Sequence, residues 1–267
     1  MKIALSIAGS DSGGGAGVQA DLLTFAAHGV HGTTAITAIT AQNTVAVTGW
    51  LALEPAMVRA QIEAVADDME IAALKTGMLA NREIIEEVAR VISERGLRNL
   101  VVDPVMVAKS GDRLLDASAE AAYVEHLFPL ATLITPNLPE AAALLSRPIT
   151  SLAEMKEAAL DLRRLGARAV LVKGGHLLGD PTDVLWDGTA LHELPTTRID
   201  TKNTHGTGCT LSAAIAALLP QAPDAPTAIR RAKDYLAGAL AAADRLDVGR
   251  GHGPVHHFHA LWRTAEN

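Results

Sequence analysis

Short apolar runs rich in Val, Ile and Leu alternate along the chain with longer segments in which Ala, Leu, Glu and Arg recur at a helical period. This alternation is typical of βαβ units and predicts an α/β fold with a largely parallel central sheet. Strands are expected at residues 3–8, 33–41, 71–74, 100–102, 132–135 and 169–172, and a hairpin at residues 184–194 with a two-residue turn at Asp187-Gly188. Helices are expected at residues 18–27, from Pro55, at 81–95, 118–128, from Pro139, and at 152–165, 211–219 and 227–243.

A chain of 267 residues can form one large α/β domain or two small ones, and all of residues 1–267 are expected to form a single domain. The sequence contains no internal repeat. Its Pro-rich segment at residues 220–226 is interpreted as a loop between two helices, since that helix pair could not fold alone.

Polar residues and glycine follow the apolar runs at the points where the predicted strands end. In an open parallel sheet, ligands bind at this edge. Carboxylates there suit a hard metal ion, lysines suit phosphates, and amides suit a heterocycle, which together favour phosphoryl transfer. The residues concerned are Gly9, Gln42 with Asn43, Lys75 with Thr76, Asp103, Asn137 and Lys173.

A tight glycine loop, Gly206-Thr207-Gly208-Cys209, leads directly into the apolar helix predicted at residues 211–219. The first N–H groups of a helix have no partner within it, so this terminus is a candidate anion site. Cys209 is the only cysteine of the chain, and the same positive potential is expected to lower its thiol pKa. The alternative is an ordinary glycine turn with a buried structural cysteine.

A second glycine cluster, at residues 15–20, fits the permissive dinucleotide-binding pattern after a strand and before a helix. That pattern also needs an acidic residue after the second strand, and residues 35–47 contain none. A nucleotide-binding oxidoreductase is therefore a distant alternative. The chain has no Gly-Lys dipeptide, which excludes a Walker-type loop and leaves the loop at Gly206 as the candidate phosphate cradle.

The net charge of −7 argues against nucleic acid or an anionic membrane as the main partner. A single cysteine permits no internal disulfide, and no apolar run approaches the length of a transmembrane helix. We therefore expect a cytoplasmic protein. The segment at residues 251–259 contains four histidines, but it is broken by Gly253-Pro254 and lacks acids, so packing is favoured over a zinc site. A non-catalytic metal-binding protein remains an alternative.

With these residues in view, the chain resembles the ribokinase-like superfamily and, within it, the hydroxymethylpyrimidine and phosphomethylpyrimidine kinases of thiamine biosynthesis. The resemblance extends from the first strand to the tail. It implies a three-layer fold with helices on both faces of the sheet, and a family that is often homodimeric. The motifs that carry it are AGSDS (8–12), TAQNT (40–44), KTGML (75–79), VDPVMVAKSG (102–111), TPNLPE (135–140), VKGGH (172–176), NTHGTGCT (203–210) and GHGP (251–254).

The resemblance implies that ATP phosphorylates the hydroxymethyl group of 4-amino-5-hydroxymethyl-2-methylpyrimidine and then the resulting monophosphate. Glu140 of the Asn-x-x-Glu element would help to place Mg²⁺, and Asp103 would assist through water. Asn137, Lys173 and Thr207 would contact ATP.

The same resemblance assigns an anion hole to four consecutive residues, whose amides would stabilise charge on the transferred group. They are Gly206, Thr207, Gly208 and Cys209. Cys209 stands where most sugar kinases of the superfamily carry an aspartate base. A thiolate is a poor match for an alcohol proton of far higher pKa, so Cys209 is interpreted as orienting the hydroxymethyl group.

Gln42 favours a pyrimidine substrate over pyridoxal, because its amide suits an aminopyrimidine edge and related pyridoxal kinases tend to have methionine there. Pyridoxal kinase activity remains the main alternative. Gly9, Met78 and Val105 match pocket positions, and Asp21 matches a family acid. The competing interpretations are a loop amide bonded to its own backbone for Gln42 and a helix-surface acid for Asp21.

Overall fold

The computed structural model describes residues 1–106 and 117–262; positions 107–111 of one quoted motif lie outside this range. Its centre is an eight-stranded sheet in the order β10-β9-β8-β7-β6-β5-β1-β2. Neighbouring strands from β8 to β2 are parallel, whereas β9 is antiparallel to β8 and β10. The largely parallel sheet is therefore confirmed. The strands are β1 (Ile3–Ala8), β2 (His31–Ile36), β5 (Ile71–Thr76), β6 (Leu100–Val102), β7 (Leu133–Ile134), β8 (Ala169–Val172), β9 (Thr182–Trp186) and β10 (Leu191–Pro195).

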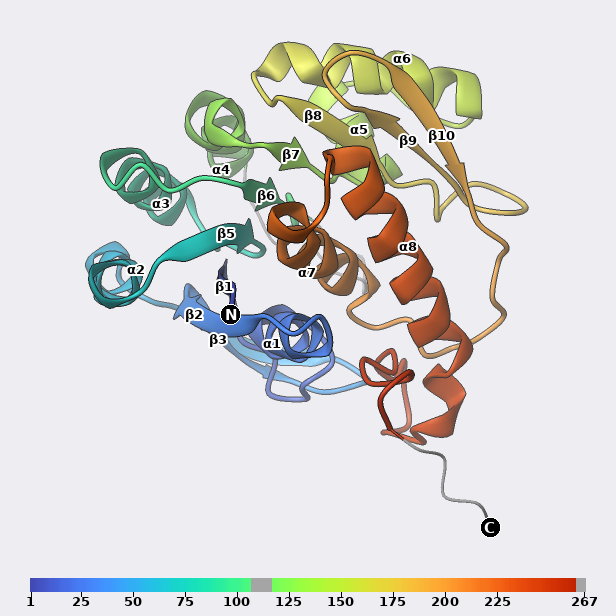
Figure 1. Ribbon diagram of the computed structural model, residues 1–267, viewed down its shortest axis with the longest axis horizontal. Helices are drawn as coiled ribbons and strands as arrows, with labels where there is room; N and C mark the ends of the chain where they lie inside the picture. The colour runs from blue at the N-terminus through green and yellow to red at the C-terminus, as the bar shows by residue number, and fades with distance from the viewer. Residues whose placement is uncertain (107–116, 263–267) are drawn as a thin grey trace.

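Helices cover both faces of the sheet, which gives the three layers that the resemblance implied (Figure 1). The first helical layer contains α2 (Pro55–Asp68), α3 (Arg82–Glu94), α4 (Ala117–Ala122), α5 (Leu138–Leu145) and α6 (Leu152–Leu162). The second contains α1 (Gly17–Ala27), α7 (Thr207–Leu218) and α8 (Ala225–Ala241). Each layer packs its own apolar cluster against the sheet. Shorter helical turns lie at Tyr123–Leu127, Phe128–Leu130, Arg163–Leu165, Leu219–Gln221 and Ala243–Arg245.

The helices differ in how their N-termini are satisfied. Asn81, Ser151 and Asp224 each accept a hydrogen bond from a backbone N–H in the first turn of α3, α6 and α8. No side chain caps α1 or α7, which begin after Ala16 and Gly206. At α1 the N–H of Val18 donates to the carbonyl of Gly9, so the terminus of α7 is the better candidate for binding a ligand at the carboxyl edge of the sheet.

Residues 33–41 do not form the single strand that the apolar pattern predicts. The chain leaves the central sheet at Thr37, whose hydroxyl donates to the carbonyl of Met78 at 2.6 Å. It then forms β3 (Ala38–Gln42), which pairs with β4 (Val47–Ala52) in a separate antiparallel sheet. The prediction was wrong because one tertiary contact divides the run, and β4 was not predicted.

The predicted hairpin near residues 184–194 is present as β9 and β10. Trp186 pairs with Leu191, and the N–H of Asp187 donates to the carbonyl of Ala190 at 3.1 Å, so Gly188 and Thr189 form the turn. The carboxylate of Asp187 accepts hydrogen bonds from the backbone N–H groups of Thr189 and Ala190, which stabilises it. The turn was predicted one residue too early, at Asp187-Gly188.

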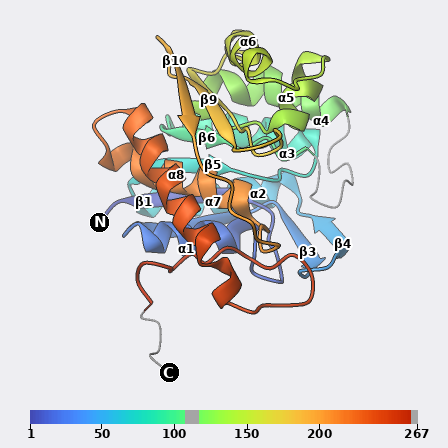
Figure 2. The same ribbon diagram turned by 90° about the vertical axis from the view of Figure 1, so that its right-hand side faces the viewer.

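The histidine-containing tail packs across the start of α7. The carbonyl of Gly253 accepts a hydrogen bond from the N–H of His205 at 3.0 Å, and the N–H of His252 donates to the carbonyl of Thr44 at 2.9 Å. Figure 2 shows this tail beside the β3–β4 hairpin. Within residues 1–106 and 117–262, no group of three His, Cys, Asp or Glu side chains is arranged to hold a metal ion. No helix in these ranges is long and apolar enough to cross a membrane.

The loop before α7 lies directly against the loop after β1. Gly206 has a φ of +75°, and a Cβ atom there would lie 1.9 Å from the carbonyl oxygen of Gly15. Only glycine permits both this backbone conformation and this approach. The contact fixes the N-terminus of α7 over the carboxyl end of β1.

Gly206→Ala is expected to lower the free energy of unfolding by about 3 kcal/mol or more, because backbone strain and a backbone clash add. Gly96→Ala is the matched control: Gly96 has a φ of +60° but open space around its Cβ position. That variant should lose only about 1 kcal/mol. Urea denaturation measures both, and equal losses would contradict a tight approach at Gly206.

Candidate active site

A cavity of about 890 Å³ lies at the carboxyl ends of β1, β5, β6 and β8 and at the N-termini of α1 and α7. Twelve of the thirteen predicted site residues line it, although they come from distant parts of the chain. They are Gly9, Gln42, Met78, Asp103, Val105, Asn137, Glu140, Lys173, Gly206, Thr207, Gly208 and Cys209. Asp21 is the exception.

At one end of this cavity, the Nζ of Lys173 donates to Oδ1 of Asp103 at 2.8 Å. Asp103 is only 2% exposed, and the hydroxyl oxygens of Thr135 and Ser212 lie 3.4 and 3.3 Å from its carboxylate. Burial disfavours the charged ammonium, but Asp103 and Glu140 outweigh it and raise the pKa of Lys173. Lys173 is therefore a permanent cation on the cavity wall.

Glu140 is held by the first turn of α5. Its carboxylate accepts a hydrogen bond from the N–H of Asn137 at 2.8 Å, and its own N–H donates to Oδ1 of Asn137 at 2.9 Å. Burial raises the pKa of Glu140 to about 7; Lys173 opposes this shift and Asp103 adds to it. The carboxylates of Glu140 and Asp103 lie close together, and Lys173 does not fully balance the charge of Glu140. Together they offer oxygen ligands that suit a hard divalent cation.

The glycine loop at the start of α7 closes this acid–lysine group from the other side. A Cβ atom on Gly208 would lie 3.4 Å from Nζ of Lys173 and 3.5 Å from Oδ2 of Asp103. The uncapped helix terminus, a lysine and two carboxylates therefore meet in one place. This arrangement can hold a phosphate chain through amides and an ammonium while the acids face a metal ion.

Cys209 lies on the cavity wall, partly exposed, one residue beyond Gly208. The sequence predicts a lowered thiol pKa, and this is wrong. Burial raises the pKa of Cys209, although Lys75 opposes the shift. The neighbouring carboxylates Asp21 and Asp103 raise it further. The group is a neutral thiol that can donate or accept a weak hydrogen bond.

Asp21 lies beneath the cavity and does not line it. Its carboxylate accepts hydrogen bonds from Nζ of Lys75 at 2.8 and 3.0 Å and from the hydroxyl of Ser6 at 2.5 Å. Both side chains of the ion pair are 0% exposed. Lys75 does line the cavity, so Asp21 influences the site through the ammonium that it holds and through its charge near Cys209.

Two functional candidates escaped sequence reasoning: Asp11 and His205. Oδ2 of Asp11 lies 2.8 Å from Nε2 of His205, although 194 positions separate them. Asp11 also accepts hydrogen bonds from the N–H groups of Gly13, Gly15 and Ala16. These amides are the ones that a dinucleotide pyrophosphate would need, so the glycine cluster is filled by the protein's own carboxylate. The three consecutive glycines at positions 13–15 were the sequence feature that could have indicated that backbone amides gather around Asp11.

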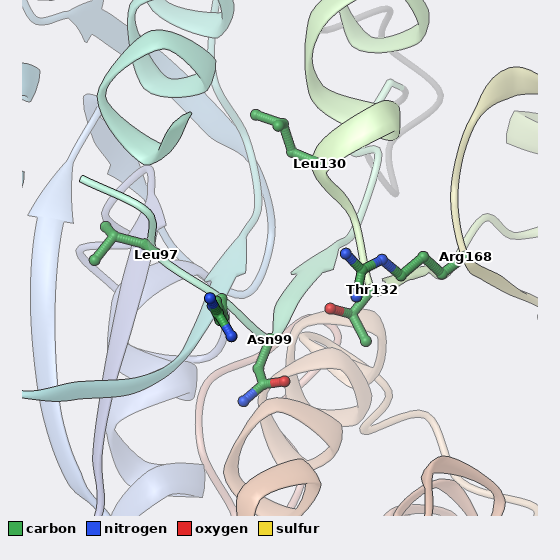
Figure 3. Close-up of a pocket in the computed structure, with 6 residues that line it drawn as sticks. Leu97, Asn99, Leu130, Thr132 and Arg168 are labelled. Atoms are coloured by element: carbon green, nitrogen blue, oxygen red, sulfur yellow. The ribbon is translucent and has the colours of Figure 1, made fainter. Parts of the chain in front are cut away.

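A smaller cavity, of about 470 Å³, opens at the opposite edge of the sheet, before β6, β7 and β8 (Figure 3). Figure 3 shows Leu97 on one side of it and Arg168 on the other. None of the predicted site residues lines this cavity. The chemistry predicted from the strand ends is confined to the larger one.

The layered sheet and its carboxyl-edge cavity are those of a ribokinase-like α/β protein. The chain belongs to the phosphomethylpyrimidine kinase family, whose model matches residues 11–256. It is 55% identical over 263 residues to a hydroxymethylpyrimidine/phosphomethylpyrimidine kinase of Rhizobium meliloti, covering 98% of each chain.

Two solved structures are similar to this chain in fold as well as in sequence. A Bacillus subtilis pyridoxal kinase in an ADP complex is 39% identical, with a TM-score of 0.91 and coverage of 98% of this chain and 100% of the other. A phosphomethylpyrimidine kinase of Clostridium difficile 630 is 40% identical, with a TM-score of 0.81 and coverage of 90% and 100%.

Asp21→Asn is expected to lower the free energy of unfolding by about 3–5 kcal/mol, because it leaves the buried ammonium of Lys75 without its counter-charge. Asp67→Asn removes the exposed partner of Arg95 and serves as the control, with an expected loss below about 1 kcal/mol. Urea denaturation at neutral pH compares the two. Similar small losses would show that Lys75 finds another partner.

Proposed function

We propose that this protein uses ATP to phosphorylate 4-amino-5-hydroxymethyl-2-methylpyrimidine to its monophosphate and then to its diphosphate, in thiamine diphosphate biosynthesis. Family membership and the 55% identical relative support the activity and the substrate. The approach of Gly208 to Lys173 and Asp103 is the structural observation that carries the proposal. It joins a phosphate-binding helix terminus to a lysine and an acid, as phosphoryl transfer requires.

We assign the nucleotide side of the cavity to Asn137, Lys173 and Thr207. Lys173 would contact the ATP phosphates, and the N-terminus of α7 would bind the transferred phosphoryl group. Glu140 and Asp103 would hold Mg²⁺, Asp103 through water; when bound, the ion neutralises phosphate charge. These side chains fit this role, because carboxylates offer the oxygen ligands that Mg²⁺ prefers. Burial also leaves the negative charge of Glu140 incompletely balanced by Lys173.

We assign the acceptor side to Gly9, Gln42, Met78 and Val105, with Cys209 between it and the phosphoryl group. The cavity lining joins these residues to the anion loop. A neutral thiol suits an orienting role for Cys209, because it can hydrogen-bond the hydroxymethyl oxygen without needing to ionise. Asp21 is proposed to support this side indirectly, by holding Lys75.

Pyridoxal kinase activity is the second candidate, supported by the 39% identical solved neighbour. A coupled ADP-release assay offers the enzyme the pyrimidine alcohol, its monophosphate and pyridoxal in parallel. Turnover of both pyrimidines is expected, with a kcat/KM above that for pyridoxal. Turnover of pyridoxal alone would replace the proposed substrate and leave the kinase chemistry intact.

Cys209→Ala is expected to slow phosphorylation of the alcohol by about 10-fold or more and phosphorylation of the monophosphate much less. The first acceptor is a neutral hydroxyl that needs orientation and loss of a proton, whereas the second is an ionised phosphate. Steady-state kcat/KM for each acceptor measures this difference. Cys209→Ser retains a hydrogen-bonding group and is the control. Equal losses in both transfers would contradict the assigned role.

We further propose a cytoplasmic homodimer, with residues 1–267 as one domain in each copy. The single cysteine supports a reducing compartment. The dimer is supported by the separate β3–β4 sheet, where Ile39 and Leu51 lie opposite each other on neighbouring strands and are 51 and 66% exposed. Contiguous exposed apolar side chains favour burial against a second copy.

Ile39→Glu combined with Leu51→Glu is expected to convert the dimer to a monomer, because two carboxylates cannot be buried in an apolar interface without partners. Leu178→Glu is the control, since Leu178 is fully exposed outside this sheet. Light scattering after size-exclusion chromatography gives the mass directly. A monomeric unmodified protein would contradict the proposal.

A further inference from the structure

The side-chain amide of Gln42 lies between two fixed polar groups. One end, placed as Nε2, is 3.2 Å from Nε2 of His205. The other end, placed as Oε1, is 3.3 Å from Oγ1 of Thr40. The two ends of an amide have nearly the same shape, so their identity follows from the hydrogen bonds that each must make.

On the first side, Nε2 of His205 cannot be an acceptor. Its Nε2 lies 2.8 Å from Oδ2 of Asp11, a carboxylate that already accepts three backbone N–H groups. Burial opposes ionisation of Asp11, but the contacts with His205 and the backbone outweigh it and lower its pKa. An ionised carboxylate only accepts, so the imidazole proton lies on Nε2 and leaves no lone pair there. An amide N–H facing this nitrogen would have no acceptor.

On the second side, Thr40 must be an acceptor. Its hydroxyl has one proton and lies 2.8 Å from the carbonyl oxygen of Ser10, which cannot donate. The proton therefore goes to Ser10, and the hydroxyl presents a lone pair to Gln42. An amide oxygen at this position would face that lone pair, whereas an amide N–H would donate to it.

We propose that His205 and Thr40 hold the Gln42 amide in one orientation, with Oε1 toward His205 and Nε2 toward Thr40, and thereby select a heterocycle whose amino group adjoins a ring nitrogen. Two contacts from different elements independently require this orientation. His205 and Thr40 are positioning residues. The inference rests on the proposed contact between Gln42 and the substrate ring.

The selected chemistry follows from what the held amide still offers to the cavity. Oε1 keeps a lone pair that can accept from an exocyclic amino group, and Nε2 keeps an N–H that can donate to a ring nitrogen. A ring without the amino group leaves Oε1 of Gln42 without a hydrogen-bond donor inside the pocket. A site with such an unpaired polar group discriminates strongly against that ring. An amide free to rotate would turn its N–H toward other rings and lose this selectivity.

The experiment compares kcat/KM for the pyrimidine alcohol with kcat/KM for its analogue lacking the 4-amino group. Thr40→Val removes the acceptor at nearly constant shape, and His205→Leu removes the donor. Each is expected to reduce the preference for the amino compound about tenfold, as expected for one or two hydrogen bonds. Thr40→Ser and His205→Asn keep a hydrogen-bonding group and should retain the preference. Unchanged preference in both Thr40→Val and His205→Leu would overturn the proposal.

The variant Gln42→Ala tests whether Gln42 contacts the substrate ring, separately from whether its amide is held in one orientation. Loss of the preference in Gln42→Ala, together with its retention in Thr40→Val and His205→Leu, rejects the orientation alone. Retention of the preference in Gln42→Ala rejects the ring contact itself. A ratio of two substrates on one preparation does not depend on the folded fraction. If His205→Leu does not fold, the pair Thr40→Val and Thr40→Ser decides the result.

Discussion

The approach of the α7 N-terminus to the Asp103–Lys173 pair is the contact on which the rest of this site depends. A glycine at position 208 leaves 3.4 and 3.5 Å between a notional Cβ and the two charged groups. Strands β6 and β8 bring these groups to the same edge of the sheet, and Gly206 lets the opposite loop reach them. Amides for an anion and carboxylates for a cation are therefore placed before any ligand arrives, which reduces reorganisation during phosphoryl transfer.

Among the described residues, one fully buried lysine–carboxylate pair and two largely buried ones support this arrangement. Asp21–Lys75 lies beneath the cavity, and Asp103–Lys173 lines it. Lys233 pairs with Asp183, whose other oxygen accepts from the N–H of Gly174, the neighbour of Lys173. Burying such pairs is costly and gives little net stability. Their value here is geometric, because each one fixes a backbone segment that borders the cavity.

Most of the sheet and most of the site were predictable from sequence, because polar residues at Asp103, Asn137 and Lys173 directly follow short apolar runs. Parallel strands place such residues at one edge, whatever lies between them. The errors have tertiary causes. The hydroxyl bond from Thr37 to Met78 divides one apolar run into two strands, and burial overrides the helix terminus at Cys209. The Asp11–His205 contact spans 194 positions, and no local pattern encodes it.

The tail joins two walls of the cavity that lie far apart in the sequence. His205 obtains its backbone partner from Gly253, and Thr44 obtains its partner from His252, so one short segment completes both walls. Local opening of that segment would leave backbone groups of both walls without partners at the same time. The two walls are therefore coupled in stability through this segment.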